Sequence, residues 1–246
     1  MTDPGDRDGS DERAALHPLA QTAEAVRQLD QDGDSDLAAS LSELAARVLD
    51  VVPQCVGMSV GLHAHGVTLT LASTAVGLQL IDGVQYVSSG PCVVAAETGE
   101  TRIARSDDPL DEEGWALFAR ATAHEGVQST LSLVLLDHDA VVGGLNLYAA
   151  TPDAFDGKVE LLAPMVRAQV GQAVLNADLD FSSRLRATEA PGVLARGQII
   201  DQATGVLAAR LGLGIDQAFD RLHDAASRAG VPVAALAKLL VEIDVE

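Results

Sequence analysis

Five basic side chains stand out near the carboxyl end of a chain that is otherwise strongly acidic. The 246 residues carry a formal net charge of −20; residues 1–190 hold 11 Lys and Arg against 29 Asp and Glu, whereas residues 191–246 hold 5 against 7. The five basic residues of this end are Arg196, Arg210, Arg221, Arg228 and Lys238. Because phosphate backbones bind cations with release of counterions, a nucleic acid would have to contact this end while the acidic remainder repels it.

A thiol is the second candidate for chemistry. Cys92 follows Gly90-Pro91 and is expected to open a short helix, where the helix dipole lowers a thiol pKa and favours the thiolate. A redox-sensing thiol is one interpretation, and a small buried hydrophobe packed at the helix start is the favoured one. Cys55 is expected in the core, and two cysteines provide neither a disulfide framework nor a cysteine zinc site.

Metal and nucleotide chemistry find less support in the sequence. His63 and His65 lie two residues apart and would share one face of a strand, as a pair of metal ligands does, although a neighbouring turn favours solvated side chains. No phosphate-binding loop or dinucleotide glycine fingerprint occurs. We therefore expect no metal, no cofactor and no catalytic residue.

The basic residues lie in a segment with the pattern of three short amphipathic helices. Between residues 193 and 241, apolar residues recur at spacings of three and four. The three stripes are Ile199, Ile200, Ala203, Val206, Leu207 and Leu211; then Ile215, Ala218, Phe219, Leu222, Ala226 and Ala229; then Val233, Leu236, Ala237, Leu240 and Val241. Gly214 and Gln217 begin the second helix, and Gly230 and Pro232 separate it from the third. We expect the helices to bury these stripes only against each other.

This segment resembles the ANTAR domain, the RNA-binding output module of bacterial antitermination regulators. The resemblance is carried by Arg196, Ile200-Asp-Gln-Ala-Thr-Gly-Val-Leu207, Ala218-Phe219 with Leu222, Ala225 or Ala226, and Leu236-Ala237 with Leu240-Val241. Thr204 stands where the family usually has Lys, and His223 and Asp224 stand where it is richer in basic residues.

The resemblance implies a function for the basic residues. Two modules of a homodimer would together bind RNA hairpins in nascent transcripts and prevent a downstream terminator from forming. The expected RNA contacts are Arg196, Arg210, Arg221, Arg228 and Lys238, with guanidinium groups directed outward, and Gln202 as a polar base reader.

The preceding residues, 37–180, predict an α+β sensor domain. The periodicity predicts a helix around 41–49, strands over 57–63 and 67–73 joined by a turn at His65-Gly66, an irregular stretch over 74–91, strands over 129–136 and 140–149, and a long helix over 155–179. In that helix Leu161, Leu162, Met165, Val166, Val170, Val174 and Leu175 are expected on the buried side. This order predicts an antiparallel sheet with helices packed on one face.

That order of elements resembles a GAF domain, a small-molecule-sensing fold. The matching pieces are Gln85-Tyr86, Gly90-Pro91-Cys92, Trp115 to Ala119, Gly126-Val127-Gln128-Ser129, Gly143-Gly144-Leu145-Asn146-Leu147-Tyr148 and Pro152-Asp-Ala-Phe155. The irregular stretch would cover one sheet face and form a pocket wall. The candidates for binding an unknown small-molecule ligand are Gln85, Tyr86, Ser89, Cys92 and Trp115.

The remaining segments are expected to be an acidic tail over 1–36 and a linker over 181–192, with the three-helix domain over 193–246. A short helix over about 16–29 is one interpretation of the tail. Asp32, Asp34, Asp36 and Glu43 have the spacing of calcium ligands, but Leu37 replaces the Gly that such a loop needs, which favours an acidic linker. No apolar run of about 18 residues and no apolar leader occurs, so we expect no membrane contact and a cytoplasmic location.

The whole sequence thus predicts a signal-responsive, RNA-binding antitermination regulator, not an enzyme, that dimerises through the long helix from Phe155. One alternative is a dimerisation or protein-interaction module that has lost RNA binding, which Thr204 and the acidic end with Glu242 and Asp244 would suit. Another is an enzyme, since one GAF branch reduces free methionine sulfoxide with cysteines. That chemistry needs paired thiols near the pocket, and only Cys92 is suitably placed.

Overall fold

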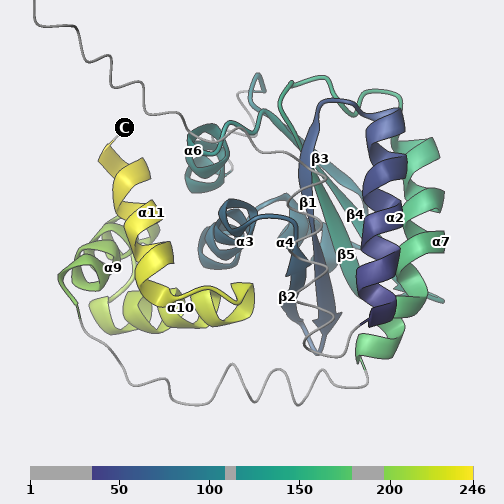
Figure 1. Ribbon diagram of the computed structural model, residues 1–246. Helices are drawn as coiled ribbons and strands as arrows, with labels where there is room; N and C mark the ends of the chain where they lie inside the picture. The colour runs from purple at the N-terminus through teal and green to yellow at the C-terminus, as the bar shows by residue number, and fades with distance from the viewer. Residues whose placement is uncertain (1–34, 109–114, 179–196, 246) are drawn as a thin grey trace, which may run out of the picture.

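The centre of the molecule is a five-stranded antiparallel sheet in the order β2-β1-β5-β4-β3. The computed structural model describes residues 35–108, 115–178 and 197–245 (Figure 1). The strands are β1 (Cys55–Ala64), β2 (Val67–Ser73), β3 (Arg102–Arg105), β4 (Ser129–Asp137) and β5 (Ala140–Ala149). Both predicted hairpins are confirmed, and His65 and Gly66 have φ of 53° and 78°, the left-handed backbone that two-residue hairpin turns require. The short β3 was not predicted.

One face of the sheet is apolar and is covered by α2 (Ser35–Val51) and α7 (Val159–Asp178) (Figure 1). Leu145 and Leu147 of β5 are fully buried against them, because successive side chains of a strand point to opposite faces. On α7 the predicted buried side is confirmed at Leu162, Met165, Val166 and Val170, which are buried, and is wrong at Leu161, which is 58% exposed.

The other face of the sheet is covered by a second layer of helices, so the prediction of helices on one face alone is wrong. This layer contains α3 (Val76–Ser88), α4 (Pro91–Thr98) and α6 (Ala116–His124). The stretch over 74–91, expected to be loop-rich with short helices and irregular in its middle, is mainly the 13-residue helix α3. Its side chains from Ile81 to Val87 are all buried, so no polar face marks it as a helix in the sequence.

The three predicted carboxyl-terminal helices are confirmed as α9 (Gln198–Leu211), α10 (Ile215–Ala229) and α11 (Val233–Val245). Gly214 begins α10, and its N–H donates to Gln217 Oε1 at 3.2 Å. The helices pack on one another and also on α3, α6 and β2, in one apolar cluster that spans both parts of the chain. The expectation that they bury their stripes only against each other is therefore wrong. Ile215, assigned to a stripe, is 60% exposed.

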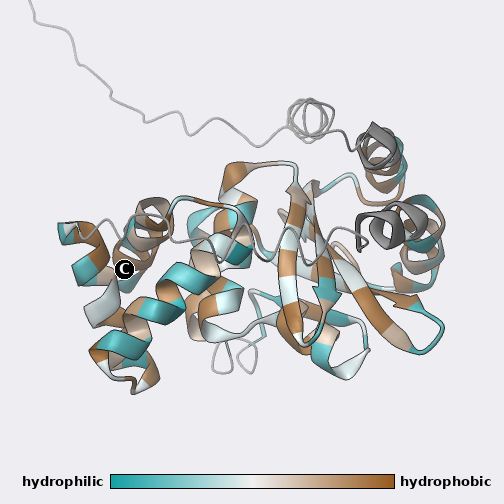
Figure 2. Ribbon diagram, turned by 90° about the horizontal axis from the view of Figure 1, so that it is seen from below, coloured by the Kyte–Doolittle hydropathy of each residue, from teal (hydrophilic) through white to brown (hydrophobic). Residues whose placement is uncertain are grey.

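Four layers result, in the order three-helix module, α3–α4–α6 layer, sheet, and α2–α7 layer (Figure 1). Hydrophobic and hydrophilic residues are interspersed along the strands and helices of the amino-terminal domain and of the three-helix module (Figure 2). This is the pattern of elements that bury one side against a neighbouring layer. The tail over 1–34, including the proposed helix over 16–29, and the linker over 181–192 lie outside the described residues. None of the described helices is long and apolar enough to cross a membrane.

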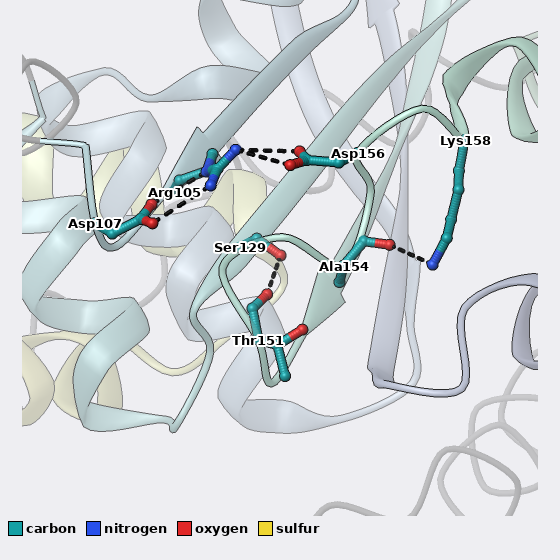
Figure 3. Close-up of polar contacts among 7 residues, drawn as sticks. All are labelled: Arg105, Asp107, Ser129, Thr151, Ala154, Asp156 and Lys158. Carbon is teal, nitrogen blue, oxygen red and sulfur yellow. Dashed lines mark hydrogen bonds and ion pairs between the residues drawn. The ribbon is translucent and has the colours of Figure 1, made fainter.

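The turn between β5 and α7 is fastened to the sheet edge by polar contacts (Figure 3). The guanidinium of Arg105 on β3 pairs with Asp107 at 3.1 Å and with Asp156 at 3.0 Å. Ser129 Oγ donates to the carbonyl of Thr151 at 2.7 Å. These contacts fix where α7 starts relative to the sheet.

Adjacent leucines of α7 test this packing. We expect Leu162→Ala, at a fully buried position, to lower the free energy of unfolding by about 2–5 kcal/mol through lost burial and a cavity. Leu161→Ala, at the exposed position, is the matched control and should change it by less than about 0.5 kcal/mol. Equal losses in chemical denaturation would contradict the described orientation of α7.

Candidate ligand site and nucleic-acid interface

The sheet face under α3 is polar although it is buried. Ser59 of β1, Asn146 of β5 and Ser132 of β4 are cross-strand neighbours and form one row. All three are at most 8% exposed, and Ser132 Oγ donates to Asn146 Oδ1 at 2.8 Å. Because strands alternate, the apolar residues between them face α2 and α7 and leave these polar groups directed at α3.

Asp82 of α3 meets this row and is the centre of the polar cluster. Its carboxylate accepts hydrogen bonds from Tyr148 Oη at 2.6 Å, from Asn146 Nδ2 at 3.2 Å and from Thr70 Oγ1 at 3.0 Å. Burial raises the pKa of Asp82 to about 6, and these hydrogen bonds oppose that rise. A buried carboxylate that no described cation neutralises by an ion pair makes this site electronegative.

A cavity of about 20 Å³ lies beside this cluster, with room for about one water molecule. Its wall includes His63, Thr68, Asp82, Tyr86, Cys92 and Asn146. His63 Nδ1 is 2.8 Å from Thr68 Oγ1, and burial lowers the pKa of this histidine, which favours its neutral form. The cavity therefore presents a carboxyl group, an amide and hydroxyls, a set suited to a ligand rich in hydrogen-bond donors.

The two histidines near the β1–β2 hairpin have different surroundings. His63 faces the cavity, so the expectation that it is solvated is wrong, whereas His65 is exposed at the hairpin turn. Within residues 35–108, 115–178 and 197–245, no group of three or more His, Cys, Asp or Glu side chains could hold a metal ion.

The structure brings some of the predicted ligand residues together and separates others. Tyr86 and Cys92 line the cavity. Gln85 lies behind it, where its Oε1 accepts a hydrogen bond from the N–H of Cys92 at 2.9 Å and its Nε2 faces Asp82 at 3.4 Å. Ser89 ends α3 with φ of 71°, and Trp115 precedes α6; neither is part of the cavity wall.

Of the two interpretations of Cys92, the structure favours the small buried hydrophobe over the redox-sensing thiol. Cys92 opens α4 as expected, but it is buried, and burial together with the nearby charge of Asp82 raises its thiol pKa well above 9.0. Desolvation outweighs the helix dipole here, so the thiol stays protonated and packs as a small hydrophobe. Cys55 is buried as predicted, and burial raises its pKa to about 11.

Sequence reasoning missed Asp82 and Asn146, and a signal for each was present. Asp82 is the only charged residue of α3, and a lone acid in an apolar helix marks a buried polar site. Asn146 stands in Leu145-Asn-Leu-Tyr148, where the polar position alternates with core leucines. That alternation reads as a solvated face unless helices cover both sides of the sheet.

A larger hollow of about 190 Å³ lies between α6 and the β3–β4 edge. Its wall includes Ala104, Arg105, Phe118, Arg120, Val127 and Thr130. Arg120 Nη1 also donates to the carbonyl of Ile243 on α11 at 2.9 Å. This hollow is therefore next to the three-helix module; its wall includes the buried polar residues Thr122, Ser129 and Thr130 but no carboxyl group.

The basic residues of the module have unequal surroundings. Arg210 pairs with Asp244, whose Oδ1 lies 2.7 Å from Nη2, and Lys238 lies 3.6 Å from Glu242. Arg221 is exposed and forms no hydrogen bond or ion pair within the part of the chain that the structure describes. Gln202 is exposed on α9, and Arg196 lies outside the described residues.

Arg228 points into the sensor, so the expectation of an outward guanidinium is wrong for this residue. Its Nε donates to the carbonyl of Thr68 on β2 at 2.9 Å, and its Cζ lies 4.4 Å from the ring centroid of Tyr86. Its Nη1 is 3.3 Å from Asp224 Oδ2, and its side chain is 18% exposed. Stacking on an aromatic face and a carbonyl acceptor hold the guanidinium more firmly than solvent would.

Comparison with known proteins identifies the module. Residues 191–241 match the family model of the ANTAR domain. The chain carries a carboxyl-terminal ANTAR domain. The helices α9, α10 and most of α11 fall within the matched range, and the ANTAR domain accordingly contains Arg210, Arg221, Arg228 and Lys238.

The sensor half has the antiparallel sheet and flanking helices that the GAF resemblance implied. Similar solved structures include a domain of a putative two-component sensor histidine kinase from Sinorhizobium meliloti, at 15% identity and a TM-score of 0.40 over 58% of this chain and 94% of that one. A GAF domain from an Acinetobacter phosphoenolpyruvate-protein phosphotransferase has 15% identity and a TM-score of 0.40 over 65% and 97%. No curated protein matches the chain.

The raised pKa of Asp82 leads to a prediction about stability. Between its usual value of 3.8 and about 6, the folded protein holds a proton on Asp82 that the unfolded chain has released. The stabilisation from this proton is present below about pH 4 and is lost as the pH rises through 6. Between pH 4 and 7, the free energy of unfolding of wild type should therefore fall by up to about 3 kcal/mol relative to that of Asp82→Asn, measured by urea unfolding.

Gln202→Ala, at an exposed position on α9, is the control for this comparison. Its difference from wild type should stay constant over the same pH range, because neither side chain ionises. A constant difference for Asp82→Asn as well would mean that Asp82 is not desolvated as described.

Proposed function

We propose that this protein is a cytoplasmic, signal-responsive antitermination regulator whose ANTAR domain binds RNA hairpins in nascent transcripts. The observation that carries the proposal is the family match at residues 191–241, which coincides with a compact three-helix unit. The protein acts by binding and not as an enzyme. The buried, protonated thiol of Cys92 supports this part of the proposal, because thiol-dependent reduction needs an accessible thiolate.

Charge supports the direction of RNA approach. Residues 191–246 carry −2 and residues 1–190 carry −18, so phosphates are repelled by the sensor half and least opposed at the module. On the module, Arg221 is exposed and Arg210 is half-exposed beside Asp244. These two side chains are the first available to a phosphate backbone.

The ligand of the sensor is proposed to enter the polar cavity at Asp82. Buried polar groups cost stability unless they are fully satisfied, and the fold does not need them on this sheet face. The present cavity has room for about one water molecule, so a larger ligand must displace side chains of its wall, among which Tyr86 contacts Arg228 of the module.

The proposal includes a homodimer formed through α7. Leu161 in the first turns of this helix is an apolar side chain that is 58% exposed, next to a helix face already committed to the core. A parallel pair of such helices would bury it and would hold two ANTAR domains close enough to share one RNA.

One set of contacts favours the second candidate, a dimerisation or protein-interaction module without RNA binding. Arg210, Arg228 and Lys238 all face carboxylates of the module itself. Thr204, which stands where the family usually has Lys, is 3% exposed, and its Oγ1 donates to the carbonyl of Ile200 at 2.8 Å. A lysine at that buried position would have to extend its ammonium group to solvent.

RNA titrations with the full chain separate the two candidates. The probe is a pool of RNA hairpins with randomised loops, measured by fluorescence anisotropy from 50 to 300 mM salt. Arg210→Ala combined with Arg221→Ala should weaken binding and lower the slope of log K against log salt by about 1.4–1.8, because two phosphate contacts are lost.

Arg102→Ala is the matched control, since Arg102 pairs with Glu100 on the sensor, away from the module. It should leave the salt slope unchanged. Wild type that forms dimers but binds no member of the pool at the lowest salt would favour the second candidate and overturn the first.

A further inference from the structure

The ANTAR domain approaches the sensor most closely at a glycine of α3. A methyl group placed on Gly83 would lie 3.1 and 3.3 Å from the two Leu236 methyl carbons of α11 and 3.4 Å from the methyl carbon of Ala229 on α10. All of these nearest atoms belong to the module. The glycine thus allows α10 and α11 to lie against α3, and a larger side chain there would separate them.

Arg228 is held beside this contact by the groups that a nucleotide offers. Tyr86 provides an aromatic face at 4.4 Å and Thr68 provides a carbonyl acceptor at 2.9 Å. An unpaired base presents the same pair, a π-face for stacking and carbonyl or ring acceptors at its edge, and Arg guanidinium planes stack on such bases in RNA complexes. The Asp224 carboxylate, 3.3 Å from Nη1, is a third partner of this guanidinium.

We infer that the α10 surface around Arg228 is a binding site for an unpaired RNA base, and that the sensor occupies this site when the ANTAR domain is docked. The inference rests on the proposed function, because it requires the domain to bind RNA. Docking and RNA binding at Arg228 exclude each other, since one guanidinium face cannot stack on Tyr86 and on a base at once.

The ring that holds Arg228 is also a wall of the polar cavity. Tyr86 Oη lies 2.9 Å from Thr70 Oγ1, which donates to Asp82 at 3.0 Å, so Tyr86 donates to Thr70 in this chain of hydrogen bonds. In the inferred mechanism, a ligand that pairs with Asp82 and enlarges the cavity displaces the Tyr86 ring, which is one of the side chains of the cavity wall. The same movement removes the aromatic face on which Arg228 stacks, and Arg228 becomes free to contact an RNA base.

The effect of docking on RNA affinity can be measured. RNA affinity is reduced by the fraction of molecules in which the domain is docked, so any change that opens the contact tightens RNA binding. Removing a desolvated cation–π contact should shift that equilibrium enough to tighten binding roughly 3- to 10-fold. The gain has to disappear when Arg228 is also removed.

The test opens the contact in two independent ways in the full chain. Gly83→Leu inserts a wedge between α3 and the module, and Tyr86→Leu removes the aromatic face. Gly171→Leu on α7 is the matched control, because the nearest atom to a side chain there is 4.0 Å away and belongs to Arg167 of the same helix. Tyr86→Phe keeps the stacking face and should stay docked.

Docking is measured separately from RNA binding. Dyes on cysteines introduced at the exposed positions Glu97 and Asp216 report the distance between α4 and α10 by energy transfer. The native Cys55 and Cys92 are buried and stay unlabelled, and dilution into unlabelled protein suppresses transfer between copies. RNA affinity is measured with the hairpin pool described above.

We expect both opened variants to lose energy transfer and to bind the pool 3- to 10-fold more tightly, and Arg228→Ala in the Gly83→Leu background to lose that gain. Opened variants that bind RNA no more tightly than wild type would overturn the inference and leave the proposed function standing. Retention of the gain after Arg228→Ala would also overturn it. Absence of RNA binding in wild type and opened variants alike would overturn both, and unchanged energy transfer in both would show that Gly83 and Tyr86 do not hold the contact.

Discussion

The structure depends on the burial of α3 from two sides. One side of this helix meets the polar sheet face through Asp82, and the other meets the ANTAR domain at Gly83. A helix with almost no solvated face gains its stability from both neighbours, since each apolar Å² removed from water contributes about 25 cal/mol. The α3–α4–α6 side of the amino-terminal domain and the ANTAR domain consequently share one apolar cluster, which is separate from the cluster against α2 and α7.

The two faces of the sheet serve different ends. The face against α2 and α7 is packed with leucine and valine and supplies stability, whereas the face against α3 carries Ser59, Ser132 and Asn146 around a carboxyl group whose burial is costly. Apolar residues at these positions would make a more stable sheet. A buried polar cluster beside a cavity, with a carboxyl group whose pKa burial raises, is typical of a recognition site, which agrees with the proposed ligand site.

The sequence predicted those elements whose hydrophobic residues follow one regular spacing and face one neighbouring layer. The hairpins of β1–β2 and β4–β5, the helix α7 and the three helices of the module were all predicted, because strand alternation and helical stripes were intact. It failed at α3, whose residues are buried all round, and at Leu161 and Ile215, whose exposure depends on which neighbour covers the helix. Asp82 escaped notice because all of its hydrogen-bond partners except Gln85 lie 12 to 66 residues away along the chain.

The carboxylates of the ANTAR domain acquire a role from this arrangement. Asp224 stands where the family is richer in basic residues, and here it flanks Arg228; Asp244 and Glu242 do the same for Arg210 and Lys238. Exposed pairs of this kind add about 1 kcal/mol or less to stability, so they are weak enough to exchange a carboxylate for a phosphate. Under the proposed function, these carboxylates would weaken the electrostatic attraction of non-specific RNA. A specific RNA could still compete with them, because its bases can also stack on the guanidinium groups. Under the proposed function, a docked domain with Arg210, Arg228 and Lys238 already paired would attract RNA weakly, so its binding would depend on the docking contact.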